Sequence, residues 1–384
     1  MKVFVLLPPR SIGVRDVALG FYNAFYNLNY QTICYESDRI YRFFAESDPG
    51  AGKLFEEEFG GVSNEVYCRL ALAGFYDFAL SGFGGEAADF ILIVDGREVP
   101  WDKIQVCQRY GIKVGLYLTD EPYEYYHTVQ FSKQYDIVFS NDLATVDLHR
   151  KYGNPNTHYL PTAFDEMHRE FYGVKKKKYD ISFVGALMKT RTDTLDAISD
   201  TLEKHMFFIQ GISSNKYPEL LPEKFRTSSE SWTEKKLREC GSKTLSVKEV
   251  TEMFNYSKIV LNIHREPEWG GNDGTEIPNI IPAFSPNPRT FEVAACNAFQ
   301  LVDDQRPEIR RMFDENEMVE YEYGNPKDLS DKIEYYLKHQ DEAKQIARRA
   351  YKKVWKEHTY TNRTKTMIEL LKSSFGSDFT KKRS

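Results

Sequence analysis

The amino-acid sequence predicts an α/β protein made of two doubly wound domains in tandem. The chain has 384 residues, which is more than a single domain usually holds. Short apolar runs alternate with helix-like stretches in both halves, and this alternation favours parallel sheets that helices cover on both faces. The alternation stops near residue 161 and restarts near residue 180. We therefore expect domains at 1–162 and 180–358, a linker at 163–179, and a C-terminal helix and tail at 359–384.

The first half contains apolar runs of strand length separated by helix-like stretches. The expected strands are 3–7, 31–35, 90–94, 114–118, 137–140 and 157–160. The expected helices are 14–28, 62–78, 101–110, 125–130 and 142–152. The N-terminal apolar run ends at prolines and is too short to span a membrane, so we interpret it as a buried strand. No other apolar run reaches membrane-spanning length, and any work near a membrane would be peripheral.

The second half repeats the pattern after four lysines at 175–178, which we interpret as a solvated linker face. The expected strands are 180–185, 206–210, 259–264 and 299–302. The expected helices are 192–204, 246–256, one at Arg289, 329–358 and 361–374. Ser246 and Glu249 have the spacing of a capping box, which supports the helix start at 246.

The charge balance and the cysteines exclude several classes of protein. The net charge of −6 argues against a surface that coats nucleic acid, although it is compatible with a local basic groove. The five cysteines are odd in number, scattered, and form no C-x-x-C pair. A disulfide framework or a zinc site is therefore not expected, and the reducing cytoplasm is the expected location.

The most informative segment is 287–296, with the sequence Asn-Pro-Arg-Thr-Phe-Glu-Val-Ala-Ala-Cys. Pro288 suits the first position of a helix, and Arg289 and Thr290 follow on its first turn. A helix N-terminus next to an arginine binds anions such as a diphosphate. Glu292, one turn further in, can accept two hydrogen bonds from a ribose diol. These are the parts needed to hold a nucleotide diphosphate, although an ordinary helix with a surface Arg–Glu pair has the same residues.

This segment resembles the donor-binding helix of GT-B glycosyltransferases. It is most similar to the CgeB-like branch (spore maturation protein type), whose pattern is roughly Arg-x-Phe-Glu followed by small residues. The resemblance implies two Rossmann-like domains that face a cleft, and a C-terminal helix that crosses back to the first domain. It also implies transfer of a sugar from a nucleotide-diphosphate sugar, with UDP as the expected nucleotide, to a hydroxyl acceptor. Because such enzymes hold the diphosphate on helix ends and basic residues, neither a metal nor a cofactor is expected.

The resemblance extends to two other strand ends in the second half. A glycine and a downstream arginine near the donor phosphates of the related enzymes match Gly185 and Arg191, although a plain turn with a solvated arginine explains them equally well. A similar Asn-x-x-Arg strand end matches Asn262 and Arg265, and a planar guanidinium suits a diphosphate. His264 is also a candidate donor contact, but we favour a hydrogen-bonded histidine in or beside the core.

The catalytic base is expected in the first domain, together with the acceptor. Asp16, near the start of the first helix, is one candidate, although the helix dipole alone explains an aspartate in a first turn. Asp120 and Glu121 follow the strand at 114–118 and precede a proline, as an acidic pair often does in the resembling family. They would act as the base, orient the acceptor, or cap the next helix. His127 is a more distant candidate.

Three features leave the mechanism and one loop open. Many retaining GT-B enzymes carry a second glutamate eight positions before the first, but that position here is Phe284, so the stereochemistry is not assigned. We interpret Asp303 and Asp304 as a turn after a strand, and not as a metal-binding motif. The stretch at 266–288 is longer than the corresponding link in related enzymes, and we expect a lid over the donor, an acceptor contact or an irregular surface excursion.

Two further functions are compatible with the same residues. A sugar-nucleotide epimerase of this fold would have the same donor site, and a non-catalytic GT-B-like module would fit the missing upstream glutamate. The acceptor is also open: a saccharide, a protein, a small molecule and a modified DNA base all fit, and the acidic net charge weighs mildly against DNA.

Overall fold

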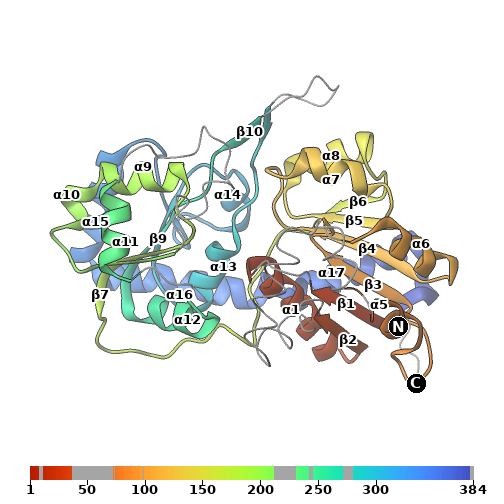
Figure 1. Cartoon of the computed structure of the whole chain (residues 1–384). Helices are drawn as coiled ribbons and strands as arrows, with labels where there is room; N and C mark the ends of the chain where they lie inside the picture. Colours follow the sequence, from red (N-terminus) through yellow and green to blue (C-terminus); the bar gives the residue numbers. More distant parts are fainter. Residues whose placement is uncertain are drawn as a thin grey trace, which may run out of the picture. The chain divides into compact units, whose positions relative to one another are not determined.

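The computed structural model describes residues 1–7, 12–36, 72, 74–97, 99–211, 231–241, 245–270 and 280–380. For residues 12, 13, 36, 269 and 270 it describes the backbone only. The chain forms two compact units, which Figure 1 shows in the colours of the sequence. Unit 1 comprises Met1–Asp165, Trp269–Pro282 and Tyr360–Ser384, and unit 2 comprises Glu166–Glu268 and Ala283–Thr359.

Unit 1 is built on a six-stranded sheet in the order β2-β1-β3-β4-β5-β6, and every pairing in it is parallel. Its strands are β1 (Lys2–Leu7), β2 (Gln31–Glu36), β3 (Phe90–Val94), β4 (Lys113–Leu118), β5 (Ile137–Ser140) and β6 (Thr157–Tyr159). The central strands β1 and β3 are buried along their whole length, as their uninterrupted apolar sequences predict.

Helices cover both faces of this sheet. They are α1 (Ile12–Asn27), α5 (Phe75–Ser81), α6 (Trp101–Arg109), α7 (Tyr125–Ser132), α8 (Leu143–Tyr152) and α17 (Tyr360–Phe375), and a short 3₁₀ turn, η4 (Ser377–Thr380), follows. Neighbouring residues of β1 point to opposite faces. Val5 packs with Phe21 of α1 and Leu371 of α17, whereas Phe4 packs with Phe75 of α5. The C-terminal helix therefore returns to the first half of the chain, as predicted, and there it lies against α1.

Unit 2 contains a five-stranded parallel sheet in the order β13-β12-β9-β7-β8. Its strands are β7 (Tyr179–Val184), β8 (Phe207–Gln210), β9 (Ser257–Asn262), β12 (Gln300–Asp303) and β13 (Val319–Tyr321). The order places β7 beside β9, and the crossover helices that follow these two strands lie on opposite faces of the sheet. Where two neighbouring strands of a doubly wound sheet are followed by helices on opposite faces, a crevice opens at the carboxyl ends of these strands.

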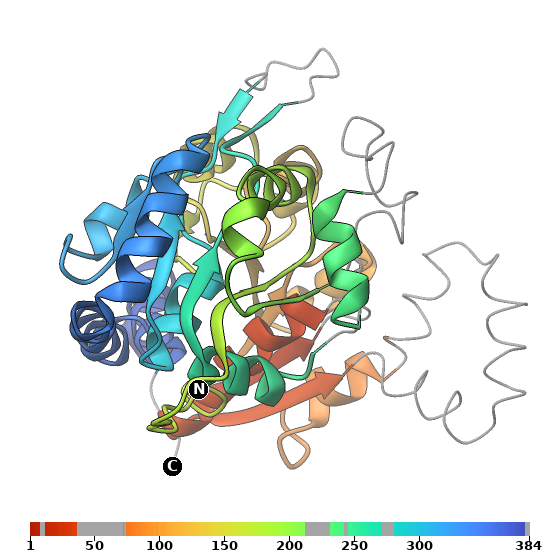
Figure 2. The same cartoon turned by 90° about the vertical axis from the view of Figure 1, so that its left-hand side faces the viewer.

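The helices of unit 2 lie on both faces of its sheet, and Figure 2 gives a second view of them. They are α9 (Lys189–Ala197), α10 (Ser199–Leu202), α11 (Trp232–Glu239), α12 (Val247–Tyr256), α13 (Pro288–Ala295), α14 (Glu308–Met312), α15 (Pro326–Lys338) and α16 (Gln340–Glu357). Leu261 of β9 packs with Leu195 of α9 and Leu329 of α15 on one face. Val260, its neighbour, packs with Val293 of α13 on the other face.

A short hairpin interrupts the second half. Strands β10 (Glu268–Gly270) and β11 (Ile280–Pro282) pair with each other, and residues 271–279 between them lie outside the described part of the chain. Ile281 is buried in unit 1, where it packs against Tyr125 and Val129 of α7. The stretch predicted as a loop at 266–288 thus includes two short strands, and Ile281 of β11 is part of the core of unit 1.

Several predicted elements were wrong in extent. The helix predicted at 192–204 is two helices, because Ile198 leaves helical geometry between α9 and α10. The helix predicted at 329–358 is also two, because His339 is non-helical between α15 and α16. The loop expected before 329 contains α14 and β13. Most of the helix predicted at 62–78 lies outside the described residues. Within the described residues, α5 begins near the end of the predicted range. Within the described residues, no helix is long and apolar enough to cross a membrane.

The packing of α17 on α1 predicts a strong size limit at Gly20. A Cβ at this position would lie 2.2 Å from Cδ2 of Tyr360, which begins α17. Although alanine favours helix by about 1 kcal/mol, we expect Gly20→Ala to lower the free energy of unfolding by about 1–3 kcal/mol through overpacking. Urea unfolding measures this change. Tyr26→Ala, at a side chain 65% exposed on the same helix, is the control, and a Gly20→Ala protein as stable as wild type would contradict the packing.

Candidate functional site

The start of α13 is built by its own sequence. Pro288 occupies the first helical position, where the missing N–H is not needed. The side chain of Asn287 caps the helix, because its Oδ1 accepts a hydrogen bond from the backbone N–H of Thr290 at 3.0 Å. This cap uses one of the N–H groups of the first turn, so positive potential for an anion comes mainly from the helix dipole and from Arg289.

A buried network of amides fixes this helix start against the sheet. Asn287 Nδ2 donates to Asn262 Oδ1 at 2.9 Å, at the carboxyl end of β9. Asn262 Nδ2 in turn donates to Thr290 Oγ1 and to Gln300 Oε1, both at 3.0 Å. Gln300 Nε2 closes the network by donating to the carbonyl oxygen of Thr290 at 2.8 Å. Asn262 and Thr290, both predicted donor contacts, therefore hold α13 in place, and their direct contact with a donor stays a prediction.

His264 and Asp303 form a second buried connection. The backbone N–H of His264 donates to Asp303 Oδ2 at 2.6 Å, and its Nδ1 lies 3.1 Å from Oδ1. His264 Nε2 accepts a hydrogen bond from the backbone N–H of Asn287 at 3.3 Å. Burial lowers the pKa of His264 despite the neighbouring carboxylate, so the ring is neutral with its proton on Nδ1. The favoured role of a hydrogen-bonded core histidine fits these contacts.

Glu292 is held as a carboxylate by two arginines. Arg169 Nη2 donates to Oε1 at 2.7 Å, and Arg289 Nη1 lies 3.2 Å from Oε2. Burial raises the pKa of Glu292, but the two guanidinium groups outweigh burial and lower the pKa below its usual value. Each carboxylate oxygen contacts one arginine and is therefore oriented before any ligand arrives. The Glu292 side chain is still 14% exposed. An ionised, oriented carboxylate is a suitable acceptor for two hydroxyl groups.

The loop after β7 approaches the end of β8 very closely. A Cβ at Gly211 would lie 1.9 Å from the carbonyl oxygen of Gly185, so there is no room for a side chain at Gly211. Arg191 ties this loop to the neighbouring strand, because its Nε donates to the Ile263 carbonyl and its Nη1 to the Ala186 carbonyl, both at 2.9 Å. Arg191 therefore has a positioning role, and its predicted phosphate contact stays a prediction.

Arg265 extends from the segment that follows β9. Its side chain is 25% exposed, and its Nε lies 3.9 Å from Glu266 Oε2. Arg306 fixes the backbone of this segment, because its Nη2 donates hydrogen bonds to the carbonyl oxygens of Arg265 and Glu266 at 3.1 Å each. A partly exposed guanidinium on a fixed backbone can bind a phosphate with little loss of freedom.

The predicted acidic pair of unit 1 splits between two environments. Glu121 is 3% exposed, and its Oε1 accepts a hydrogen bond from Thr128 Oγ1 at 2.5 Å and lies 3.4 Å from His149 Nε2. Glu121 is therefore a buried carboxylate that is held by neighbours of its own unit, and its role as a catalytic base stays a prediction. The Asp120 side chain is 40% exposed, at 3.9 Å from Arg97, and stays a candidate.

The other candidates of unit 1 lie on helices. Asp16 is the fifth residue of α1 and half-buried, so it lies beyond the first turn to which we assigned it, and its catalytic role stays a prediction. His127 lies in α7. Among the residues that the structure describes, no group of three or more His, Cys, Asp or Glu side chains is placed to hold a metal ion.

Sequence reasoning missed three buried charged residues of unit 2. Arg169 lies in the predicted linker, Arg306 in a predicted loop, and Asp303 was interpreted as part of a turn although it ends β12 in full burial. Arg169 pairs with Glu292 across 123 residues of sequence, which no local pattern reveals. Of the three, only Asp303 could have been assigned from its local sequence. An aspartate directly after an apolar strand lies at the crevice of a doubly wound sheet, which is where a functional role is expected.

Comparisons with known proteins agree with this description. The model of the family described as Glycosyl transferase-like matches residues 204–369. The spore protein CgeB of Bacillus subtilis (strain 168) is 24% identical over 273 residues, which cover 71% of this chain and 79% of that protein.

Two solved structures share the fold over nearly the whole chain. HepE of Anabaena, in complex with UDP and glucose, superposes with a TM-score of 0.59 at 11% identity, covering 97% of this chain and 100% of that one. The DNA-modifying enzyme beta-glucosyltransferase superposes with a TM-score of 0.54 at 14% identity, covering 97% and 99%. These matches confirm the resemblance to GT-B glycosyltransferases and CgeB and the fold of two Rossmann-like sheets, and they support the prediction of a glycosyltransferase.

The two arginines on Glu292 should differ in their contribution to stability. The Arg169 side chain is 6% exposed, whereas that of Arg289 is 25% exposed. Removing Arg169 takes away the more buried of the two charges that compensate Glu292, so we expect Arg169→Ala to lower the free energy of unfolding by about 3 kcal/mol. Arg289→Ala should lower it by about 1 kcal/mol, because water screens the more exposed pair. Urea unfolding of both variants checks this order, and equal losses would contradict it.

The environment of His264 predicts a measurable titration. Its pKa in the folded protein should lie below 6.5, with the neutral Nδ1–H form populated at pH 7. Because the fold favours the neutral form, its contribution to stability is complete above about pH 6.5 and is lost as the pH falls through the folded pKa. Nitrogen-15 NMR of the imidazole, assigned with His264→Gln, measures both pKa and tautomer. A pKa above 6.5 or an Nε2–H tautomer would contradict the network.

Proposed function

We propose that this protein transfers a sugar from a UDP-sugar to a hydroxyl acceptor without the help of a metal ion. The observation that carries the proposal is the state of Glu292, an ionised carboxylate on the second turn of α13, oriented by Arg169 and Arg289. A ribose presents two adjacent hydroxyl donors, and such a carboxylate can accept from both. UDP is the proposed nucleotide because HepE and beta-glucosyltransferase, which share the fold, were solved with UDP or its glucose conjugate.

In the proposed complex, the diphosphate lies beside the start of α13. The helix dipole and Arg289 supply positive potential there, and Arg265 supplies a partly exposed guanidinium from the end of β9. During transfer, the acceptor oxygen bonds to the anomeric carbon while the bond from that carbon to the diphosphate breaks. The hydroxyl proton passes to a base, for which we propose Asp120, and the diphosphate leaves with one more negative charge. Oriented cationic groups stabilise that developing charge, so a metal ion is not required in this scheme.

The acceptor is proposed only as a hydroxyl compound. A saccharide, a protein, a small molecule and a hydroxylated DNA base are all compatible with the proposed transfer. Structures of this fold include beta-glucosyltransferase, which modifies DNA, and an alpha-glucosyltransferase solved with UDP and a DNA containing an HMU base. The net charge of −6 does not favour DNA, because DNA binding draws mainly on lysine and arginine contacts to phosphates.

Calorimetric titration of UDP tests the donor site. We expect UDP to bind the wild-type protein and to bind Glu292→Gln about 10- to 100-fold more weakly, because hydrogen bonds to a charged acceptor contribute about 1.5–3 kcal/mol. Glu315→Gln, at an exposed glutamate outside this site, is the matched control and should bind like wild type. Absence of UDP binding, or equal affinity in Glu292→Gln, would contradict the proposed site.

Product analysis separates transfer from epimerisation. UDP-sugars are incubated with and without a panel of hydroxyl acceptors, and the products are identified by mass spectrometry and NMR. Transfer predicts release of UDP together with a glycosylated acceptor. Formation of an isomeric UDP-sugar in the absence of any acceptor would instead favour the epimerase alternative, and UDP binding with neither product would favour the non-catalytic one.

A further inference from the structure

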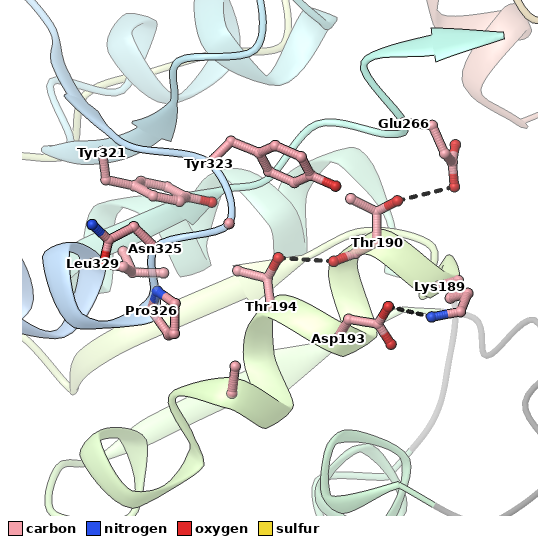
Figure 3. A pocket seen from close by; sticks show the side chains of 12 residues that line it. Lys189, Thr190, Asp193, Thr194, Glu266, Tyr321, Tyr323, Asn325, Pro326 and Leu329 are labelled. Atoms are coloured by element: carbon pink, nitrogen blue, oxygen red, sulfur yellow. Dashed lines mark hydrogen bonds and ion pairs between the residues drawn. The ribbon is translucent and has the colours of Figure 1, made fainter.

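Unit 2 contains a cavity of about 540 Å³ at the carboxyl edge of its sheet. One wall is α9, and the opposite wall is the stretch from the end of β13 to the first turns of α15 (Figure 3). The lining residues are Lys189, Thr190, Asp193, Thr194, Ala197, Glu266, Tyr321, Tyr323, Gly324, Asn325, Pro326 and Leu329. This volume lies within the range of about 300–1,000 Å³ that is typical of small-molecule sites.

The cavity is distinct from the site around α13. Its walls include Tyr321 and Leu329, which belong to the core on the face of the sheet that α9 and α15 cover. Val293 of α13 packs on the opposite face. None of the residues that hold the start of α13 lines the cavity. Glu266, which accepts a hydrogen bond from Thr190 at 3.1 Å, is the lining residue nearest in sequence to Arg265.

A buried polar group without a described partner points to a missing ligand. Tyr321 is 2% exposed, yet its hydroxyl has no hydrogen-bond partner among the described residues. Buried hydroxyl groups in native proteins are nearly always paired, and leaving one unpaired lowers stability. Figure 3 shows the hydroxyls of Tyr321 and Tyr323 directed toward the side of the cavity where Thr190 and Thr194 lie. Because the hydroxyl itself has almost no accessible surface, a ligand in the cavity would give it a partner once the neighbouring lining side chains move aside.

The charged side chains of the lining have charged partners. Its one ammonium, Lys189, is ion-paired with Asp193, and Glu266 lies 3.9 Å from Arg265, which is outside the lining. A phosphate or a carboxylate ligand would therefore find no cation in the lining that a carboxylate does not already neutralise. Carboxylates, threonine hydroxyls and a phenol are instead the partners that sugar hydroxyls use, since each sugar hydroxyl both donates and accepts. The rings of Tyr321 and Tyr323 add flat apolar surface for the C–H face of a pyranose.

We propose that this cavity is a second ligand site, which binds an uncharged saccharide independently of the nucleotide. The proposal rests on the cavity alone and does not require the donor site to be as proposed above. In a glycosyltransferase, such a site would hold part of a saccharide chain or a sugar that regulates the enzyme. The Tyr321 hydroxyl is the group that the ligand would satisfy, and Tyr323 is the side chain that would stack on it.

The test is saccharide binding to the full chain without nucleotide. Glucose, galactose, maltose and cellobiose are titrated and followed by saturation-transfer and chemical-shift NMR, with inorganic phosphate as an anionic probe. We expect at least one sugar to bind and phosphate not to compete with it. Tyr321→Phe removes only the hydroxyl and should weaken binding about tenfold, the loss of one hydrogen bond. Tyr323→Ala should abolish binding.

Controls separate this site from folding and from the donor site. Tyr321→Phe removes an unpaired buried hydroxyl, so its stability should equal or exceed that of wild type. Tyr335→Phe, at a tyrosine 45% exposed outside the cavity, and Glu292→Gln should both bind the sugar like wild type. The proposal is overturned if no sugar of the panel binds, if Tyr321→Phe and Tyr323→Ala bind like wild type, or if Glu292→Gln abolishes binding. If the wild-type protein binds the sugar but not UDP, only the donor site is overturned.

Discussion

The fixed position of the N-terminus of α13 is the constraint on which the candidate site depends. A helix start can orient a ligand only if it cannot move relative to the sheet that carries the other groups. Here Asn287 is tied to Asn262 through its side chain and to His264 through its backbone, and His264 is tied to Asp303 at the end of β12. Because these contacts are buried and mutually satisfied, moving α13 would break several hydrogen bonds in a medium of low polarity.

The second constraint is electrostatic. Burial alone would raise the pKa of Glu292, and Arg169 and Arg289 outweigh burial and lower that pKa below its usual value. Arg169 comes from the start of unit 2 and also contacts Thr251 of α12, so the carboxylate is coupled to the packing of α12 against the sheet. The site thus combines a neutral polar network at the helix start with a charged one a turn later. The first sets the geometry, and the second sets the charge that a diol would meet.

The sequence predicted those parts that depend on local pattern. Apolar runs place every strand of the two sheets except β13 within one or two residues, and the Pro288 and Asn287 start of α13 follows from capping rules. Non-local contacts were not predictable in this way. Nothing near Arg169 indicates Glu292, and nothing near Glu121 indicates that it is buried against His149 while Asp120 stays exposed. The helix breaks at Ile198 and His339 were also missed, because neither residue is a glycine or a proline.

A crystal structure with UDP bound tests the central account most directly, because it locates each part of the nucleotide. The account predicts that both ribose hydroxyls lie within hydrogen-bond distance of Glu292 while Arg169 keeps its contact with the same carboxylate. It also predicts that the diphosphate lies at the start of α13, beside Arg289. A nucleotide bound elsewhere in unit 2, or bound here with its ribose away from Glu292, would contradict the account.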